Sequence, residues 1–302
     1  MKKLAIVLLF ALSVAVLAQD TPEPAKAGAE RFSRQTDVNA INYSDIYCSG
    51  FVSPQKYSRA NHVTGGLQSP QATRFAEREY VYLAGGGYTV GSVYSVLREV
   101  QDSNKFEVFP GQLKMISKIG GMYADIAHLR VTYIEGKSAV AIVEFACEPV
   151  VSGDFLVPFV ARPEIKLTAR TAPFQIYKPI EGSDTGRLLM GRDFDQFLGT
   201  GQKVYVSMGT NKGVKIGDYL RITRNYDPDA MAPIDRISQY ATAVEDTQKN
   251  PAKLGKSAQK DMPFHGIGEM IVVNVTETTA TGIITLSLED AQPGDFIEHT
   301  RR

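Results

Sequence analysis

Hydrophobic residues along most of the chain occur in short runs, and Gly, Asp, Asn or Pro separates one run from the next. Residues 129–134 alternate apolar and polar side chains, as a half-buried strand does. Gly136-Lys137 then predicts a turn, and residues 139–145 return as a partner strand with several β-branched side chains. Residues 80–83 and 93–97 are further runs of this kind. The pattern predicts an all-β protein made of short strands.

The strand pattern occurs twice along the chain. Residues 126–155 align with residues 267–296 without a gap, at an offset of 141 positions, and both stretches end in Gly-Asp-Phe. Upstream residues repeat at a different offset, with Val81-Tyr82, Gly91 and Arg98 corresponding to Val204-Tyr205, Gly217 and Arg224. Chance similarity between two all-β segments is the alternative interpretation, but the ungapped match favours an internal duplication.

Each copy is too small to bury a core as a flat sheet. The runs and turns indicate about five short strands in each copy, and a sheet of this size buries its apolar face by curling into a small barrel. We therefore expect one β-barrel module at residues 41–162 and a second at residues 196–302. Residues 163–195 contain several prolines and glycines and are expected to connect the two modules, either as a linker or as an extra hairpin that crosses from one to the next.

The first residues have the three-part layout of a secretory signal peptide. Lys2-Lys3 is positive, residues 4–15 are almost entirely apolar, and small or medium residues end the segment at Ala18. A transmembrane anchor is the competing interpretation, but a spanning helix needs about 20 apolar residues. We expect residues 1–18 to be removed as a signal peptide and residues 19–40 to form a flexible leader. The mature protein is then periplasmic or secreted, with no transmembrane span.

The charge of the chain argues against nucleic acid as a partner. Without Lys2 and Lys3, the 33 basic residues become 31 against 33 acidic residues, which is a net charge of −2. Proteins that bind nucleic acid present an excess of basic residues, and none occurs here. No polybasic run is present to hold an anionic membrane surface either.

The chain has two cysteines, Cys48 and Cys147. An even number of cysteines in an exported protein predicts a disulfide, because the compartment is oxidising. Two buried free thiols are the alternative. A nucleophilic role for Cys48 is less favoured, because no histidine accompanies it in a recognisable motif.

Catalytic and metal-binding patterns are absent from the sequence. The four histidines, His62, His128, His265 and His299, have none of the spacings typical of metal ligands. We therefore expect no catalytic residues, no metal and no cofactor. The favoured hypothesis is a non-enzymatic protein that binds another envelope protein or peptidoglycan through its barrel loops. The alternative is a cell-wall-directed hydrolase whose carboxylates come together only in the fold.

A long loop distinguishes the second copy from the first and is a candidate contact surface. It covers residues 225–266, and the alternative interpretation is a tolerated insertion. Several apolar residues in it fall at helical spacing and predict a short amphipathic helix. The candidate contact residues are Asn225, Tyr226, Ile234, Ile237, Tyr240 and Val244.

Four tyrosines cluster in the first copy, at positions 80, 82, 88 and 94. They could form a surface on which a glycan or peptide stacks. Strand alternation places Tyr80 and Tyr82 on one face, where packing between neighbouring strands is the favoured interpretation.

Several motifs of the second copy resemble a family of small barrels. These are Val-Tyr-Val at 204–206, Gly-Val-Lys-Ile-Gly-Asp at 213–218, Ile-Gly-Glu at 267–269 and Pro-Gly-Asp at 293–295. They are similar to the C-terminal domain of flagellar assembly protein T and to modules that accompany LysM domains in bacterial envelope proteins. The first copy departs from this pattern, since Gly91 precedes Ser92 where the family has Gly-Asp. The resemblance implies a fold and an envelope location, and it carries over no catalytic residue.

Overall fold

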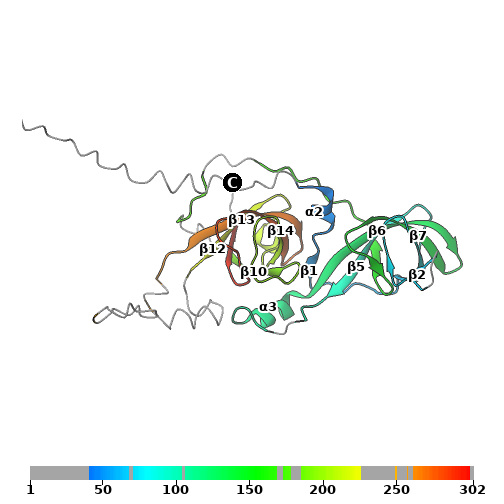
Figure 1. Ribbon diagram of the computed structural model, residues 1–302, viewed down its shortest axis with the longest axis horizontal. Coiled ribbons are helices and arrows are strands. Elements are labelled where there is room, and N and C mark those ends of the chain that lie inside the picture. The colour runs from blue at the N-terminus through cyan, green and yellow to red at the C-terminus, as the bar shows by residue number, and fades with distance from the viewer. Residues whose placement is uncertain are drawn as a thin grey trace, which may run out of the picture. The chain divides into compact units, whose positions relative to one another are not determined.

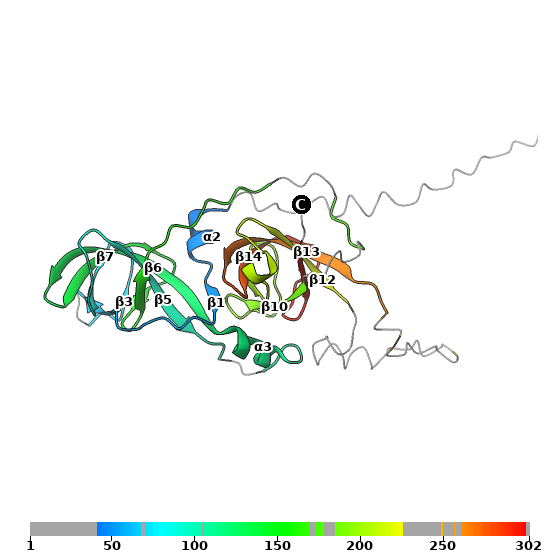
Figure 2. The same cartoon turned by 180° about the vertical axis from the view of Figure 1, so that it is seen from behind.

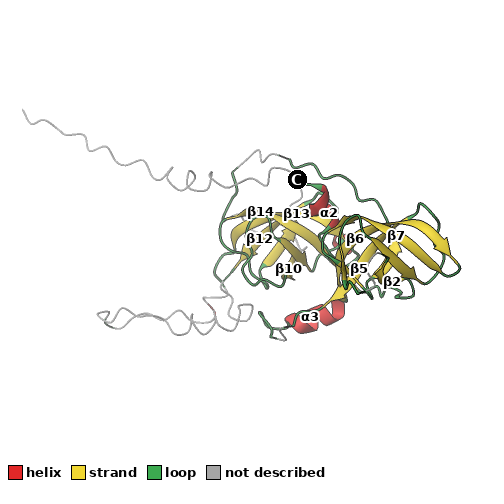
Figure 3. Ribbon diagram, turned by 45° about the vertical axis from the view of Figure 1, so that its right-hand side comes forward, coloured by secondary structure: helices red, strands yellow, loops and turns green. Residues whose placement is uncertain are grey.

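A computed structural model describes residues 41–67, 71–103, 106–168, 173–177, 185–225, 249, 257 and 261–299. These described residues are dominated by β-strands, with two short α-helices (Figure 3). None of the helices in these ranges is both long enough and apolar enough to cross a membrane. The expected signal peptide and leader, residues 1–40, lie outside the described residues.

The first barrel closes through six antiparallel strands in the order β2-β4-β7-β6-β5-β9. Figure 1 labels β2, β5, β6 and β7 of this barrel. The strands are β2 (His62–Gly66), β4 (Tyr80–Ala84), β5 (Val93–Val100), β6 (Gly121–Glu135), β7 (Ser138–Ala146) and β9 (Phe155–Pro158). Alternation decides which side chains point inward: Val81 and Leu83 are buried, whereas Tyr82 between them is exposed. The inward side chains form one apolar core with Ile126, Leu129 and others.

The second barrel has the same construction. Its order is β10-β11-β14-β13-β12-β15, and it is closed. The strands are β10 (Thr185–Gly191), β11 (Lys203–Val206), β12 (Tyr219–Arg224), β13 (His265–Val275), β14 (Ala280–Ser287) and β15 (Phe296–His299). Its core includes Leu188, Val204, Leu220, Ile267 and Ile284, all of which are fully buried.

The predicted duplication is confirmed at the level of individual pairings. Strand order is identical in the two barrels, and the β6–β7 and β13–β14 hairpins carry bulges at equivalent places. These bulges fall at His128/Leu129 and Val131/Tyr133 in the first barrel, and at Glu269/Met270 and Val272/Asn274 in the second. Both Gly-Asp-Phe turns use a glycine at positive φ, Gly153 at 94° and Gly294 at 102°, where a side chain would be strained.

An arginine–aspartate pair also occurs once in each barrel. Arg98 donates from Nε and Nη2 to the two carboxylate oxygens of Asp154, each at 2.8 Å. Arg224 makes the same two bonds with Asp295, each at 2.8 Å. Each pair ties the strand before the long hairpin to the turn before the last strand of its barrel.

The structure corrects two details of the sequence analysis. Each barrel has six strands rather than five. The additional strand of the second barrel, β10, falls inside residues 163–195, the segment expected to connect the modules as a linker or an extra hairpin. Its sequence, Thr-Gly-Arg-Leu-Leu-Met-Gly, lacks the β-branched runs that indicate strands, so burial in the barrel core outweighs a weak local preference.

A segment near the N-terminus contacts both barrels, and we call residues 46–53 the anchor segment. It runs from the end of helix α2 (Tyr43–Tyr47) through β1 (Phe51–Ser53), which pairs with β6 of the first barrel. The predicted disulfide is present: Cys48 and Cys147 are bonded, with their Cα atoms 5.5 Å apart. In Figures 1 and 2, β1 begins beside α2 and meets the end of the long strand β6.

Smaller elements complete the fold. They are β3 (Arg74–Phe75), β8 (Val150–Val151), helix α3 (Gln112–Ile119) and the 3-10 turn η1 (Thr210–Lys212). Helix α3 contacts the second barrel, because the Gln112 side chain donates to the backbone oxygen of Leu189 at 2.8 Å. Val52, Ile119 and Tyr205 then share one apolar cluster, which joins the anchor segment, α3 and β11.

Candidate functional site

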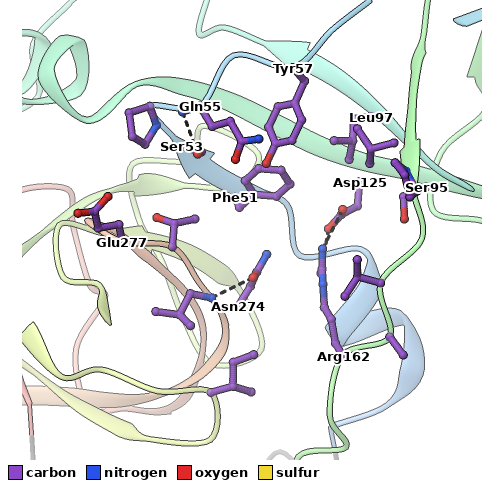
Figure 4. Close-up of a pocket in the computed structure, with 18 of the residues that line it drawn as sticks. Phe51, Ser53, Gln55, Tyr57, Ser95, Leu97, Asp125, Arg162, Asn274 and Glu277 are labelled. Atoms are coloured by element: carbon purple, nitrogen blue, oxygen red, sulfur yellow. Dashed lines mark hydrogen bonds and ion pairs between the residues drawn. The ribbon is translucent and has the colours of Figure 1, made fainter. Parts of the chain in front are cut away.

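The candidate site is a groove of about 610 Å³ lined by residues of both barrels (Figure 4). Strands β5, β6 and β9 supply one wall, together with β1 and residues 54–57. Residues 160–163, which leave the first barrel, form the edge, and residues 274–277 at the end of β13 face them. The groove therefore depends on loops and strand ends from both copies of the duplication.

One side of the groove is aromatic. Phe51 lies 5.9 Å from Tyr57 and 5.4 Å from Tyr123, measured between ring centroids, and Tyr57 stacks on Phe155 at 6.2 Å. The Tyr123 hydroxyl donates to the backbone oxygen of Gln55 at 3.1 Å, which fixes the loop after β1. Burial raises the pKa of Tyr57 from its ordinary value of 10.0. The neutral phenol can donate a hydrogen bond.

The opposite end of the groove contains a buried ion pair. Arg162 donates from Nη1 and Nη2 to the two carboxylate oxygens of Asp125, each at 3.1 Å. The Gly50 backbone N–H also donates to Asp125, and Arg162 Nη1 donates to the Ile46 carbonyl at 2.6 Å. The Arg162 backbone N–H donates to the Tyr47 hydroxyl at 2.7 Å. Burial raises the pKa of the Asp125 carboxyl, and the Arg162 guanidinium opposes that shift.

Exposed polar side chains line the mouth of the groove. Gln55 and Glu277 are exposed, while Asn274 is half-buried and accepts a hydrogen bond from the Val275 backbone N–H at 2.9 Å. Asn274 and Glu277 lie across the groove from Asp125 and Arg162 (Figure 4). The lining thus combines aromatic rings, two side-chain amides and charged groups of both signs. This combination suits a polar ligand with apolar parts.

The sequence-predicted residues are spread over other parts of the molecule. Cys48 and Cys147 are joined in a disulfide beside the anchor segment. Of the six candidate contact residues, only Asn225 is described, and its side chain is buried directly after β12. Tyr226, Ile234, Ile237, Tyr240 and Val244, together with the predicted short helix, lie outside the described residues.

Of the four clustered tyrosines of the first copy, two pack against each other and two lie on the outer face of a strand. Tyr94 is buried, and Tyr88 packs against it with centroids 5.5 Å apart. Tyr80 and Tyr82 share the outer face of β4, as the alternation predicts, and Tyr82 is 40% exposed.

The hydrolase hypothesis requires two acids in one cleft with opposed pKa shifts. Asp125 and Glu277 line the groove, but they occupy opposite sides of it (Figure 4). Asp125 is held by Arg162 and Gly50 within the groove wall. Within the described ranges, no three His, Cys, Asp or Glu residues are placed to hold a metal ion.

Sequence reasoning did not identify the groove residues. Phe51, Tyr57, Asp125 and Arg162 belong to no motif, and they converge because β1 pairs with β6 and the disulfide holds the preceding segment. The only signal in the sequence was Cys48, since its pairing with Cys147 places the anchor segment against the first barrel.

The chain matches no model of a known protein family, and the curated proteins contain no sequence similar to it.

Proposed function

We propose that the protein is a non-enzymatic component of the cell envelope that binds a peptide ligand in the groove. The ligand is a segment of another envelope protein or the peptide portion of peptidoglycan, and these two share the same chemistry. The observation that carries the proposal is a groove of about 610 Å³ that combines the Tyr57 ring with the exposed Gln55 and Glu277 side chains. Amides and a carboxylate pair with peptide groups, while an aromatic ring packs on an apolar side chain.

The buried ion pair supports binding rather than catalysis. Asp125 accepts hydrogen bonds from Arg162 and from Gly50, so its oxygens are used in holding the anchor segment and residue 162 together. A catalytic carboxylate has to reach a substrate proton or a reacting carbon. The envelope location is proposed from the N-terminal segment and from the disulfide, which is typical of oxidising compartments.

The test compares a groove variant with a matched surface variant. Gln55→Ala combined with Glu277→Lys changes two exposed side chains of the groove. Gln101→Ala combined with Asp193→Lys makes the same chemical changes at exposed positions outside the groove. The mature protein is cosedimented with purified peptidoglycan in one arm, and used to capture envelope proteins in the other.

We expect one arm to retain the wild-type protein and the matched variant, and the groove variant to bind about tenfold more weakly there. Retention in the peptidoglycan arm or in the protein arm identifies the source of the peptide. The proposal fails if neither arm retains the wild-type protein, or if the groove variant binds as well as the wild type.

A further inference from the structure

One outer face of the second barrel is covered by the anchor segment. Hydroxyl groups on this face donate to its backbone carbonyls: Tyr205 to Ser49 at 3.3 Å and Thr281 to Gly50 at 2.9 Å. Thr279 donates to Val52 at 2.6 Å. Tyr205, Thr279 and Thr281 are each 1% exposed as a result. This face therefore recognises a polypeptide through its main-chain carbonyls.

Among the residues that the structure describes, no segment covers the equivalent face of the first barrel. Tyr205 pairs with Thr281 across β11 and β14, and Thr281 pairs with Asn274 on β13. The duplication places Tyr82, Val140 and Tyr133 at these three positions, and they pair across β4, β7 and β6 in the same register. The residue equivalent to Thr279 is Ser138, which keeps the hydroxyl. We call Tyr82, Tyr133, Ser138 and Val140 the first-barrel face.

The first-barrel face is open and more apolar than its counterpart. Tyr82 is 40% exposed and Tyr133 is 56% exposed, whereas Tyr205 is 1% exposed. Val140 replaces Thr281 and Tyr133 replaces Asn274, so the face gains apolar area while Tyr82 and Ser138 retain donors. Exposed aromatic residues gathered on a strand face are typical of interaction surfaces.

We propose that the first-barrel face binds a segment of another protein, in the way that the second barrel holds the anchor segment. The occupant is a polypeptide that lies along the face and presents backbone carbonyls to Tyr82 and Ser138. It carries a small residue over the tyrosine and an apolar side chain nearby. This site is separate from the groove and does not depend on the ligand proposed there.

The requirement for a small residue comes from Gly50. A Cβ atom added at Gly50 would lie 2.4 Å from the Tyr205 hydroxyl oxygen, and Gly50 also has a φ of 65°. A larger residue at that position would push the segment away from the tyrosine. Because Tyr82 occupies the same position in the first barrel, its occupant meets the same restriction.

The experiment uses a labelled synthetic peptide with the sequence of residues 47–55, in which Cys48 is replaced by serine. The protein's own anchor segment is tied to the first barrel by the disulfide and by β1–β6 pairing, and it covers the second barrel through the bonds from Tyr205, Thr279 and Thr281. The first-barrel face is therefore the open site. Binding to the full mature chain is followed by fluorescence anisotropy. The variants are Tyr82→Ser with Tyr133→Ser, and the control is Tyr177→Ser, which alters another exposed tyrosine.

We expect saturable binding that falls at least about tenfold in the Tyr82→Ser/Tyr133→Ser variant and is unchanged in Tyr177→Ser. A second peptide carrying Gly50→Val should bind at least about tenfold more weakly, and this comparison does not rely on a protein variant. The proposal is overturned if no binding saturates below about 1 mM. It is also overturned if the Tyr82 variant binds normally, or if soluble glycan chains bind at Tyr82 and the peptide does not.

Discussion

At the scale of single residues, His128 occupies an environment that opposes its protonation. It is 6% exposed and lies among the rings of Tyr43, Tyr47, Phe145 and Phe159, with centroids 4.6 to 6.0 Å from its own. Its Nδ1 is 3.0 Å from the Tyr43 hydroxyl. Burial lowers the pKa of His128 to about 4, and the positive charge of Arg162 adds to the shift while Glu144 opposes it. The neutral imidazole is therefore part of the folded structure.

A dependence of stability on pH follows from this lowered pKa. The unfolded chain takes up a proton on His128 near pH 6.5, while the folded protein does so only near pH 4. The free energy of unfolding should therefore fall as the pH is lowered from about 6.5 to 4, by up to about 3 kcal/mol from this residue. Urea unfolding at several pH values measures it.

The His128→Gln variant is the control for this prediction, because glutamine does not titrate. Acidic groups such as Asp125 and Asp295 titrate in both proteins and cancel in the comparison. The wild type should lose more stability than the variant over this pH range. Parallel curves for the two proteins would contradict the prediction.

At the scale of elements, the disulfide fixes the anchor segment against β7. Cys48 follows helix α2 and Cys147 follows β7, with a sequence separation of 99. In the chain-entropy description, a crosslink that closes a loop of about 100 residues stabilises the folded state by about 4 to 5 kcal/mol. Replacing both cysteines by serine should therefore lower the free energy of unfolding by several kcal/mol, which chemical denaturation measures directly.

Reducing the disulfide of the wild type distinguishes the effect of the crosslink on stability from the effect of replacing the cysteine side chains. A reducing agent should lower the stability of the wild type to near that of the Cys48→Ser/Cys147→Ser variant, and should leave the variant unchanged. Equal stability of the oxidised wild type and the variant would show that β1–β6 pairing and the bonds from the second barrel hold the anchor segment without the crosslink.

The elements also show how far local sequence determines the fold. Alternation and turns predict the long hairpins β6–β7 and β13–β14, because period-two patterns of β-branched residues mark a half-buried strand. Local patterns fail for β10, which has no such run, and for β1, whose three residues are all buried. Both strands form because tertiary pairing and burial outweigh their weak local preference.

The candidate site was less predictable than the fold for the same reason. Asp125 lies within the apolar first half of β6, between Ala124 and Ile126, and only the position of Arg162 shows that its charge is paired. A single sequence carries no signal for a pair 37 positions apart in which neither residue belongs to a motif. The duplication, by contrast, was visible, since Arg98 and Arg224 with their aspartates recur at matching positions.

At the scale of the whole molecule, the two barrels are joined through the anchor segment. Thr281 donates to the Gly50 carbonyl at 2.9 Å in a fully buried position. Thr281→Val should leave this carbonyl without its donor and lower the free energy of unfolding by about 1 to 3 kcal/mol. Thr132→Val is the matched control, because the exposed Thr132 hydroxyl donates to the Val140 carbonyl at 3.1 Å. That substitution should change stability by less than about 0.5 kcal/mol.

Calorimetry shows whether this contact couples the barrels. In the wild type we expect both barrels to unfold in one transition, and in Thr281→Val we expect the transition to broaden or divide as the contact weakens. An unchanged single transition with unchanged stability would mean that Thr281 does not contribute to the coupling.

The contacts of the anchor segment also determine which parts of the fold can form early and which must form late. Its hydroxyl partners lie 156 to 231 positions further along the chain. Contacts of such long range slow folding, because the entropy of closing the intervening chain is lost before the contacts form. While a chain emerges from its N-terminus, β1 can pair with β6 well before residue 281 exists. For that interval the carbonyls of Gly50 and Val52 lack their hydroxyl donors and are available to other chains. The newly synthesised protein is therefore most vulnerable to aggregation until β14 has formed.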